Sequence, residues 1–500
     1  MNRQAGAART LGPARRFGDL RIGAHGCVMQ IVVLASFLVG LTLVHPDTLG
    51  DLMPPGWPAV IAFCAYLCIA GALTRVHTML GVRALGACDQ LPASWKRSHG
   101  LLTVLAQCWL IGGLAALIAL GYGRWVMEDL GGRHVPLLPK LLVLGPFFAA
   151  VLLTWVLDYP FYRATRCRII AQELRAGASL PPPWTLGQYI TYNVRHYLLF
   201  IAVPVGLIVL LMDVLVLYVA PLLPQGLRPH VLLGMMVVTA AGVFLLAPLL
   251  IVRIWRTSPL PPSRLRRELE NACNAMSLRC RDILVWQSGG TIANAGVMGL
   301  IRPVRYVLLS DTLLDQMDPR HIRAIFAHEA GHILSRHILH AAVFAVSTVL
   351  LCGAAGEWLM RSLGWSTWAG GMTILALLGV TWTVGFGWMS RRFERQSDVL
   401  AAWASGRPGP GEPPGRITHE GAAVFARALE RVGELNGIPA RQRNWRHGSI
   451  AHRVGYILWL ASIGGTRDWI DRTVRRIKLG LWIGLAVAAA VTILQSVVYA

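Results

Sequence analysis

Long runs of apolar side chains, separated by short polar segments, dominate the 500-residue chain. A helical run of about twenty apolar residues can cross the hydrocarbon core of a bilayer, which is about 30 Å thick. The chain contains nine such runs, and they cover residues 27–45, 56–74, 101–121, 139–157, 197–219, 231–253, 338–358, 370–389 and 477–498. The pattern therefore predicts a mainly α-helical, polytopic membrane protein with about nine transmembrane helices.

Composition supports this interpretation, because 55% of the residues are hydrophobic and only 14% are charged. Charged residues make up about a quarter of a typical soluble protein. The first run is too long for the core of a signal peptide and no small-residue cleavage site follows it, so we interpret it as a retained anchor. Nine cysteines are scattered without paired spacing, which argues against a disulfide framework and against a zinc site made of cysteines.

The formal net charge of +22 raises the question of a nucleic-acid partner, and the distribution of the basic residues answers it. Arginine and lysine concentrate before the first run, after the second and after the fourth, whereas the alternate loops carry few of them. Basic loops beside transmembrane helices lie on the cytoplasmic side. We therefore expect a multi-pass protein of the cell (inner) membrane, with its N-terminus and the segments after the sixth and eighth runs in the cytoplasm. No nucleic-acid partner is expected.

Two longer polar segments, residues 254–337 and 390–476, remain when the apolar runs are removed. In the first, Ser263 can cap a helix that extends to about Leu278. Three short strands are predicted after this helix, at residues 282–288, 291–299 and 305–311. The pattern predicts a small α+β domain that faces the cytoplasm.

The sequence HEAGH lies on a helix that is predicted to begin at Asp318 and to run directly into the seventh apolar run. The four-residue spacing of His328 and His332 places both imidazoles on one face, where they could reach one metal ion. Glu329 lies beside them and is placed to take a proton from a water molecule rather than to bind the metal. The alternative is an interfacial helix whose histidines meet lipid headgroups.

A third metal ligand is predicted beyond a membrane hairpin. Glu394 follows the eighth apolar run, and Asp398 lies one helical turn later, where it could orient a ligating histidine. From His332 to an apex near Gly364 is about 32 residues, and from there to Glu394 about 30, so the two helical arms differ by only about 3 Å. The hairpin should return Glu394 to the height of the histidines. The alternative is a solvated charged face beside three neighbouring arginines.

Five stretches of the sequence carry a family resemblance in a fixed order. They are NAGVMG (294–299), YVLLSDTLL (306–314), HEAGHILSRH (328–337), SRRFERQSD (390–398) and RHGSIAHRV (446–454). Over about residues 258–460 the chain resembles the integral-membrane zinc metallopeptidase family that includes HtpX and the CAAX prenyl endopeptidases, of the glutamate-zincin type. Two positions depart from the family pattern, since Ser397 replaces an alanine and Gly448 replaces a proline.

The resemblance implies a ligand set and a general base. His328, His332 and Glu394 would bind one Zn²⁺. Glu329 would be the general base of peptide hydrolysis, and Asp398 would stand behind a ligating histidine.

The resemblance also implies a wall around the site. His447 and Arg453 would support the transition state or stand behind the ligands, although Gly448 leaves the aim of His447 open. Asn294 and Ala295 would begin an edge strand that binds an extended peptide through main-chain hydrogen bonds. A plain structural strand is the alternative for these two residues.

Four other residues are not assigned a catalytic role, and for one of them, Asp213, two interpretations remain. His321, His337 and His340 are taken as structural or interfacial. Asp213, inside the fifth apolar run, is either a functional residue or a hydrogen-bond partner of a neighbouring helix, because an ionised carboxylate in lipid is costly.

Taken together, the resemblance implies a membrane-embedded, zinc-dependent endopeptidase that cleaves membrane or membrane-associated proteins for quality control. Its partners would be a protein or peptide substrate and the lipid bilayer. One alternative is a processing protease for a specific lipidated or prenylated peptide, and another is a non-catalytic membrane scaffold or transporter. The expected organisation is an N-terminal membrane domain with about six transmembrane helices (1–253), a metallopeptidase domain (254–476) interrupted by a transmembrane hairpin at about 338–389, and a C-terminal helix (477–500).

Overall fold

The computed structural model describes residues 57–87, 93–128, 135–175, 182–290, 292–365, 367–406 and 415–498, together with a few helical positions between residues 29 and 36. Within these residues, eight helices are long and apolar enough to cross a membrane, judged by length and composition. They span residues 57–86, 100–126, 138–171, 186–222, 234–254, 337–363, 369–405 and 468–495. The prediction of a polytopic helical membrane protein is confirmed. Most of the first apolar run, 27–45, lies outside the described residues.

Within the described residues, the first half of the chain contains helices and no strand, and short π-helical or 3-10 segments adjoin several of these helices. Its elements are α2 (Trp57–Ala87), α3 (Ala93–Leu117), η2 (Ile118–Tyr122), α4 (Gly123–Glu128), α5 (Leu138–Arg175), α6 (Leu186–Asn193), η4 (Val194–Leu199), α7 (Phe200–Val214), η5 (Leu215–Val219), η6 (Ala220–Leu222) and α8 (Arg228–Ile254). Helices α2, α3 and α5 pack against one another around the fully buried side chains of Leu114, Ile118 and Phe147.

Asp213 of α7 is bound by the start of α5. Its Oδ1 lies 2.5 Å from Nζ of Lys140, and its Oδ2 accepts a hydrogen bond of 2.9 Å from the backbone N–H of Leu137. The intramembrane carboxylate is therefore paired with a cation and a free helix-terminal donor, which offsets the cost of burying its charge. Of the two interpretations of Asp213, the structure supports the bond to a neighbouring helix.

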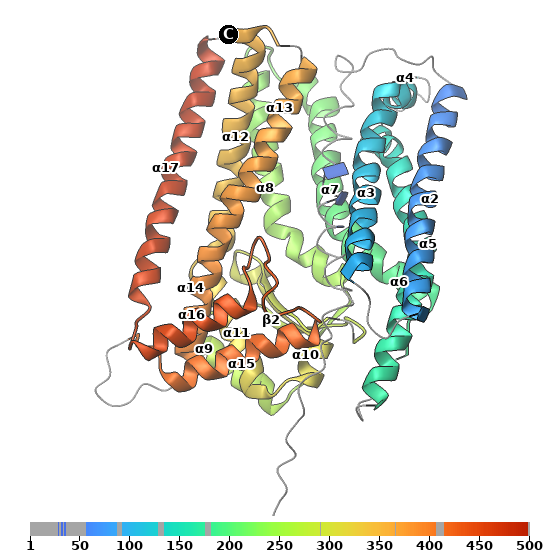
Figure 1. Ribbon diagram of the computed structural model, residues 1–500. Helices are drawn as coiled ribbons and strands as arrows, with labels where there is room; N and C mark the ends of the chain where they lie inside the picture. Colours follow the sequence, from blue (N-terminus) through green and yellow to red (C-terminus); the bar gives the residue numbers. More distant parts are fainter. Residues whose placement is uncertain are drawn as a thin grey trace, which may run out of the picture.

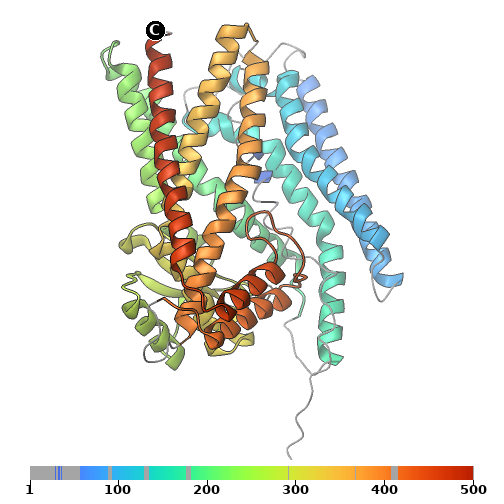
Figure 2. The ribbon, with the colours of Figure 1, turned by 60° about the vertical axis from the view of Figure 1, so that its left-hand side comes forward.

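The second half of the chain combines a small sheet with helices. Its elements are β1 (Thr257–Pro259), α9 (Arg264–Ala275), β2 (Asp282–Trp286), β3 (Ala295–Met298), η7 (Arg302–Val304), β4 (Tyr306–Ser310), α10 (Asp311–Gln316), α11 (Pro319–Leu334), α12 (His337–Leu363), α13 (Thr367–Val380), η8 (Thr381–Phe386), α14 (Gly387–Ser405), α15 (His419–Leu435), α16 (Ile450–Ser462) and α17 (Asp468–Val498). The sheet and helices α9, α10, α11, α15 and α16 lie together at one end of the long helices (Figures 1 and 2).

The sheet has the strand order β1-β2-β4-β3. Strands β2 and β4 run parallel, whereas β3 is antiparallel to β4 and forms one edge. The three predicted strands are present. The sheet also contains the short strand β1 at Thr257–Pro259, which the sequence analysis did not predict because three residues show no strand pattern.

Side-chain caps start the helices that frame the site, as the sequence predicts. Ser263 accepts from the N–H of Arg266 at the start of α9. Asp318 accepts from the N–H of Arg320 at 2.7 Å, and Pro319 occupies the first position of α11, where no backbone donor is needed.

The prediction that the motif helix runs directly into the seventh apolar run is wrong. Helix α11 ends at Leu334, and α12 begins at His337, because Arg336 adopts a left-handed conformation with φ of 52°. The N–H of Arg336 bonds to the carbonyl of Ile333, and the amine of Lys478 in α17 donates to the carbonyl of Ser335. The lysine thus occupies a carbonyl that a continuous helix would use for its own ladder.

After His337 the chain forms the hairpin that its two helical arms of similar length predict. Helix α12 ends at Leu363, and Gly364 closes it in the left-handed conformation with φ of 62°, which glycine adopts at little cost. Helix α13 packs against α12 on the return, and α14 ends beside α11. Figures 1 and 2 show this hairpin rising from the small domain next to α17.

Candidate metal centre

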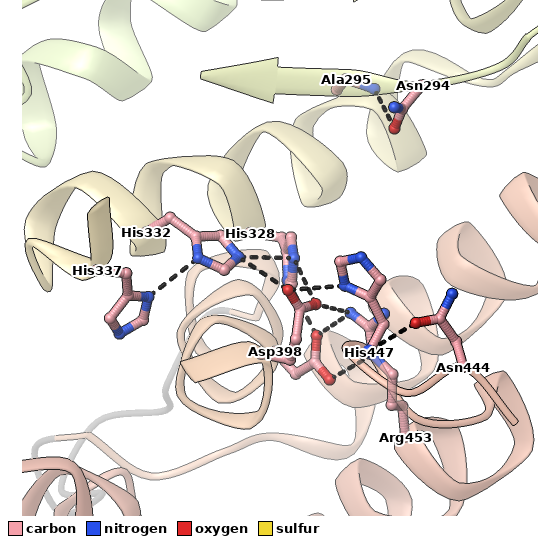
Figure 3. Close-up of polar contacts among 10 residues, drawn as sticks. Asn294, Ala295, His328, His332, His337, Asp398, Asn444, His447 and Arg453 are labelled. Carbon is pink, nitrogen blue, oxygen red and sulfur yellow. Dashed lines mark hydrogen bonds and ion pairs between the residues drawn. The ribbon is translucent and has the colours of Figure 1, made fainter. Parts of the chain in front are cut away.

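The two histidines of the motif meet on one face of α11. The Nε2 atoms of His328 and His332 lie 3.3 Å apart. Glu394 approaches them from α14, with its Oε2 3.5 Å from Nε2 of His328 and its Oε1 3.6 Å from Nε2 of His332. One ligand atom from each of the three residues lies within 4.8 Å of the others. Figure 3 shows the imidazoles of His328 and His332 side by side, with His447 next to them.

Helix α14 can reach the histidines because Gly331 has no side chain. A Cβ atom on Gly331 would lie 3.1 Å from Cα and 3.1 Å from Oγ of Ser397, which is tighter than ordinary van der Waals contact. Ser397 is the residue that departs from the family's alanine, and its buried hydroxyl has no hydrogen-bond partner among the described residues. The close approach of the two helices therefore depends on a glycine in the middle of the motif.

Asp398 and Arg453 stand directly behind the ligands. Oδ1 of Asp398 lies 2.9 Å from Nδ1 of His328. Arg453, on α16, donates from Nε to Oδ2 of Asp398 at 2.8 Å and from Nη2 to Oδ1 at 2.6 Å. The same Nη2 lies 3.3 Å from Oε2 of Glu394. The guanidinium thus bridges the two carboxylates in a buried, bidentate arrangement.

His447 reaches the site through a tight turn. Its Nδ1 lies 2.8 Å from Oε1 of Glu394, and its side chain is 42% exposed. Asn444 and Gly448 exchange two backbone hydrogen bonds around it, and Gly448 has φ of +78°. Proline cannot adopt this conformation because its ring holds φ near about −65°. The glycine at this position therefore belongs to a turn of a different shape, and this turn aims His447 at Glu394.

Burial and neighbouring charges shift the pKa values of the two motif histidines in opposite directions. Burial lowers the pKa of His332 to about 4, so its imidazole is neutral and free to bind a cation. Burial also acts to lower the pKa of His328, but hydrogen bonds with Asp398 and Glu394 outweigh it and raise the pKa to about 10. The carboxylates therefore create a negative potential at His328 that favours a bound cation.

Glu329 lies between the two histidines in the sequence and is half-buried. Burial raises the pKa of its carboxyl to about 7, and the charges of His328, Glu394 and Arg453 act on it. A carboxyl with a pKa near neutrality can both accept and release a proton at physiological pH.

His337 also belongs to the site, although its position in the sequence did not predict this. Its Nδ1 lies 3.0 Å from Nδ1 of His332, and its side chain is only 3% exposed. In a continuous helix, residues five apart point about 140° away from each other, so the spacing carried no signal. The left-handed residue Arg336 breaks the helix and turns His337 back toward His332. His340, by contrast, contacts the carbonyl of Arg336 at 2.8 Å and the ring of Trp482.

Asn294 and Ala295 lie at the start of β3, across α11 from Asp398 in the view of Figure 3. The N–H of Ser310 donates to the carbonyl of Asn294, so this pair is hydrogen-bonded. Hydrogen-bonded and non-hydrogen-bonded positions alternate in an antiparallel ladder, so the backbone groups of Ala295 and Val297 point away from β4. Asn294 Oδ1 accepts from the N–H of Ala295 at 3.0 Å. No hydrogen bond or ion pair among the described residues joins this pair to the histidines and Glu394.

The residues of this centre fit a zinc ion. Two imidazole nitrogens and one carboxylate oxygen form a donor set that is typical of catalytic zinc sites, which keep one further position open. Nδ1 of His328 also contacts the carboxylate of Asp398, and metal-binding histidines commonly have such a partner on their other ring nitrogen.

Residues 259–413 match the sequence model of peptidase family M48. The stretch contains His328, Glu329, His332 and Glu394, while His447 and Arg453 lie beyond it. The chain therefore carries an M48 peptidase domain, and the resemblance derived from its motifs is confirmed. Together with the eight apolar helices, this domain defines a membrane-embedded metallopeptidase.

Other comparisons add one structural likeness. The crystal structure of Ste24p from S. mikatae is 17% identical in sequence, covers 81% of this chain and all of its own, and superposes with a TM-score of 0.49. None of the curated proteins compared matches the chain.

The contact at Gly331 yields a prediction about the fit of α11 and α14. Gly331→Ala should destabilise the protein by about 1–3 kcal/mol, the usual cost of overpacking. It should also lower the metal content of the purified protein, because α14 carries Glu394. Thermal unfolding and metal analysis would measure the two effects.

A double variant makes this prediction specific. Removing the hydroxyl in Ser397→Ala relieves one of the tight contacts, so the double variant should be less destabilised than Gly331→Ala alone. Gly353→Ala is the matched control, since a Cβ there meets nothing within 4 Å. Equal destabilisation by Gly331→Ala and Gly353→Ala would contradict the argument.

Proposed function

We propose that this protein is a zinc-dependent endopeptidase that cleaves peptide bonds in membrane or membrane-associated proteins, with a role in their quality control. The observation that carries the proposal is the convergence of His328, His332 and Glu394 within 4.8 Å of one another in an M48 domain. His328, His332 and Glu394 would hold one Zn²⁺.

The basic loops support an orientation in the cell (inner) membrane with the site on the cytoplasmic side. The proposed organisation is an N-terminal membrane domain (1–253), the peptidase domain (254–476) with its transmembrane hairpin, and the C-terminal helix (477–500).

Four residues would divide the chemistry. Bound zinc would supply Lewis-acid chemistry, polarising the scissile carbonyl and acidifying a water molecule. Glu329 accepts the proton of the attacking water and passes it to the leaving amine. His447, whose side chain is exposed at the site, would provide a hydrogen-bonding group for the oxygen on which charge develops. Arg453 would hold Glu394 and Asp398 in place from behind the ligands. Asp398 holds the ring of His328 through its Nδ1.

The free edge of β3 would bind the substrate. The carbonyl of Ala295 and both main-chain groups of Val297 point away from β4 and can pair with a peptide in an extended conformation. Such pairing depends little on the side chains of the peptide. It suits a protease that acts on unfolded or exposed segments of many proteins.

Replacing Glu329 should separate catalysis from metal binding. Glu329→Gln should keep about one zinc ion per chain and lose about 10²–10⁴-fold in cleavage of an unstructured membrane-protein substrate, because the general base is gone. Metal analysis and a gel-based cleavage assay in detergent would measure both. Glu434→Gln is the control, since Glu434 is exposed and its carboxylate pairs with Arg431, away from the site. Full activity in Glu329→Gln would refute the proposed role.

Replacing Glu394 should have the opposite pattern. Glu394→Gln removes a charged ligand while keeping the shape of the side chain, so the zinc content should fall well below one ion per chain and activity should fall with it. Addition of excess zinc should restore part of the activity. A variant that keeps its zinc at the same affinity as the unaltered protein would show that Glu394 is not a ligand.

A further inference from the structure

The second ring nitrogens of the two motif histidines face different partners. Nε2 of each histidine points to the shared centre with Glu394. Nδ1 of His328 lies 2.9 Å from a carboxylate oxygen of Asp398, whereas Nδ1 of His332 lies 3.0 Å from Nδ1 of His337. His328 is therefore held directly by an anion, and His332 by a second imidazole.

The contact of His332 continues into a chain of polar groups that ends on α17. Nε2 of His337 lies 2.8 Å from Oε1 of Gln396, and Nε2 of Gln396 donates to Oδ1 of Asp471 at 2.6 Å. His337 and Gln396 are 3% and 9% exposed, so water competes little for these bonds. The imidazole of His337 also stacks on Phe393, with ring centroids 4.2 Å apart and planes 4° from parallel, and this packing fixes its plane.

The carboxylate of Asp471, at one end of this series of contacts, determines which group donates and which accepts in every hydrogen bond of the series. An ionised carboxylate only accepts, so the Gln396 amide must donate to Asp471 and present its carbonyl oxygen to His337. His337 then carries its hydrogen on Nε2 and accepts at Nδ1. Nδ1 of His332 must donate to it, which leaves Nε2 of His332 without hydrogen and ready to bind a cation.

The last long helix contributes more than Asp471 to this arrangement. Lys478 of α17 donates to the carbonyl of Ser335, next to the left-handed Arg336 that turns His337 toward His332. Helix α17 also packs against both α12 and α14, which carry His337 and Gln396. The chain of contacts thus exists only when α17 is docked.

We propose that His337, Gln396 and Asp471 are positioning residues that fix the tautomer and ring orientation of His332, so that the C-terminal helix α17 completes the metal centre. The inference rests on the proposed function, because it assumes that His332 is a metal ligand. Asp471 acts on His332 through two intermediate side chains, as Asp398 acts on His328 directly.

The experiment measures zinc affinity of the purified full-length protein by competition with a chromophoric chelator. His337→Phe keeps a ring that can stack on Phe393 but removes both nitrogens, and it should raise the zinc Kd by about 10–100-fold. His340→Phe is the matched control, since His340 is also buried on α12 but contacts the carbonyl of Arg336 and the ring of Trp482. Its zinc Kd should equal that of the unaltered protein.

A second set of variants tests the far end of the chain without disturbing the buried histidine. Asp471→Leu should weaken zinc binding in the same direction as His337→Phe but to a smaller extent. Asp471→Asn keeps an acceptor oxygen for Gln396 and should restore most of the affinity. Asp468→Leu, one turn earlier on the exposed side of α17, should have no effect. These variants decide the question even if His337→Phe does not fold.

The possible outcomes separate this inference from the proposed function. If the unaltered protein binds no zinc, the proposed function fails. If it binds zinc and the affinities of His337→Phe and Asp471→Leu equal those of their controls, the function stands and the positioning chain is wrong. A lower unfolding temperature of the metal-free His337→Phe protein, with zinc affinity unchanged, would likewise assign these residues a purely structural role and overturn the inference.

Discussion

The close contact between α11 and α14 is the constraint on which the metal centre depends. Gly331 allows the backbone of Ser397 to approach it, and this approach sets the distance between the histidines on one helix and Glu394 on the other. The two helices are separated in the sequence by a membrane hairpin, so their contact also holds the hairpin and the small domain together. A side chain at this one position would act on the ligand geometry and on the packing of the domain at once.

Buried charge is the second property that shapes the site. Asp398 and Glu394 are 1% and 5% exposed, and both face the single guanidinium of Arg453. Two carboxylates against one fixed cation leave an excess of negative charge, which the histidines compensate by holding a proton or a metal cation. The same charges thus favour metal binding and hold the ligands in place.

Several features could be predicted because they depend on neighbours in the sequence. The transmembrane helices follow from runs of apolar residues, and the starts of α9 and α11 follow from the caps Ser263 and Asp318. The shared face of His328 and His332 follows from helical periodicity. The return of Glu394 to their height follows from the near-equal lengths of the hairpin arms, since each helical residue advances the chain by about 1.5 Å.

Other features were decided only when distant segments met. Lys478, which is far away in the sequence, binds the carbonyl of Ser335 at the break beside Arg336, and this break brings His337 to His332. The contact of His447 with Glu394 joins the turn between Asn444 and Gly448 to α14, which lies about 50 residues earlier in the sequence. The sequence by itself determined which elements form and which side chains share a helix face, because those depend on local periodicity. Only the tertiary structure decided which ligand each supporting group contacts, and that His337, Gln396 and Asp471 are among these groups. These partners come from α12, α14, α16 and α17, and no local pattern relates them.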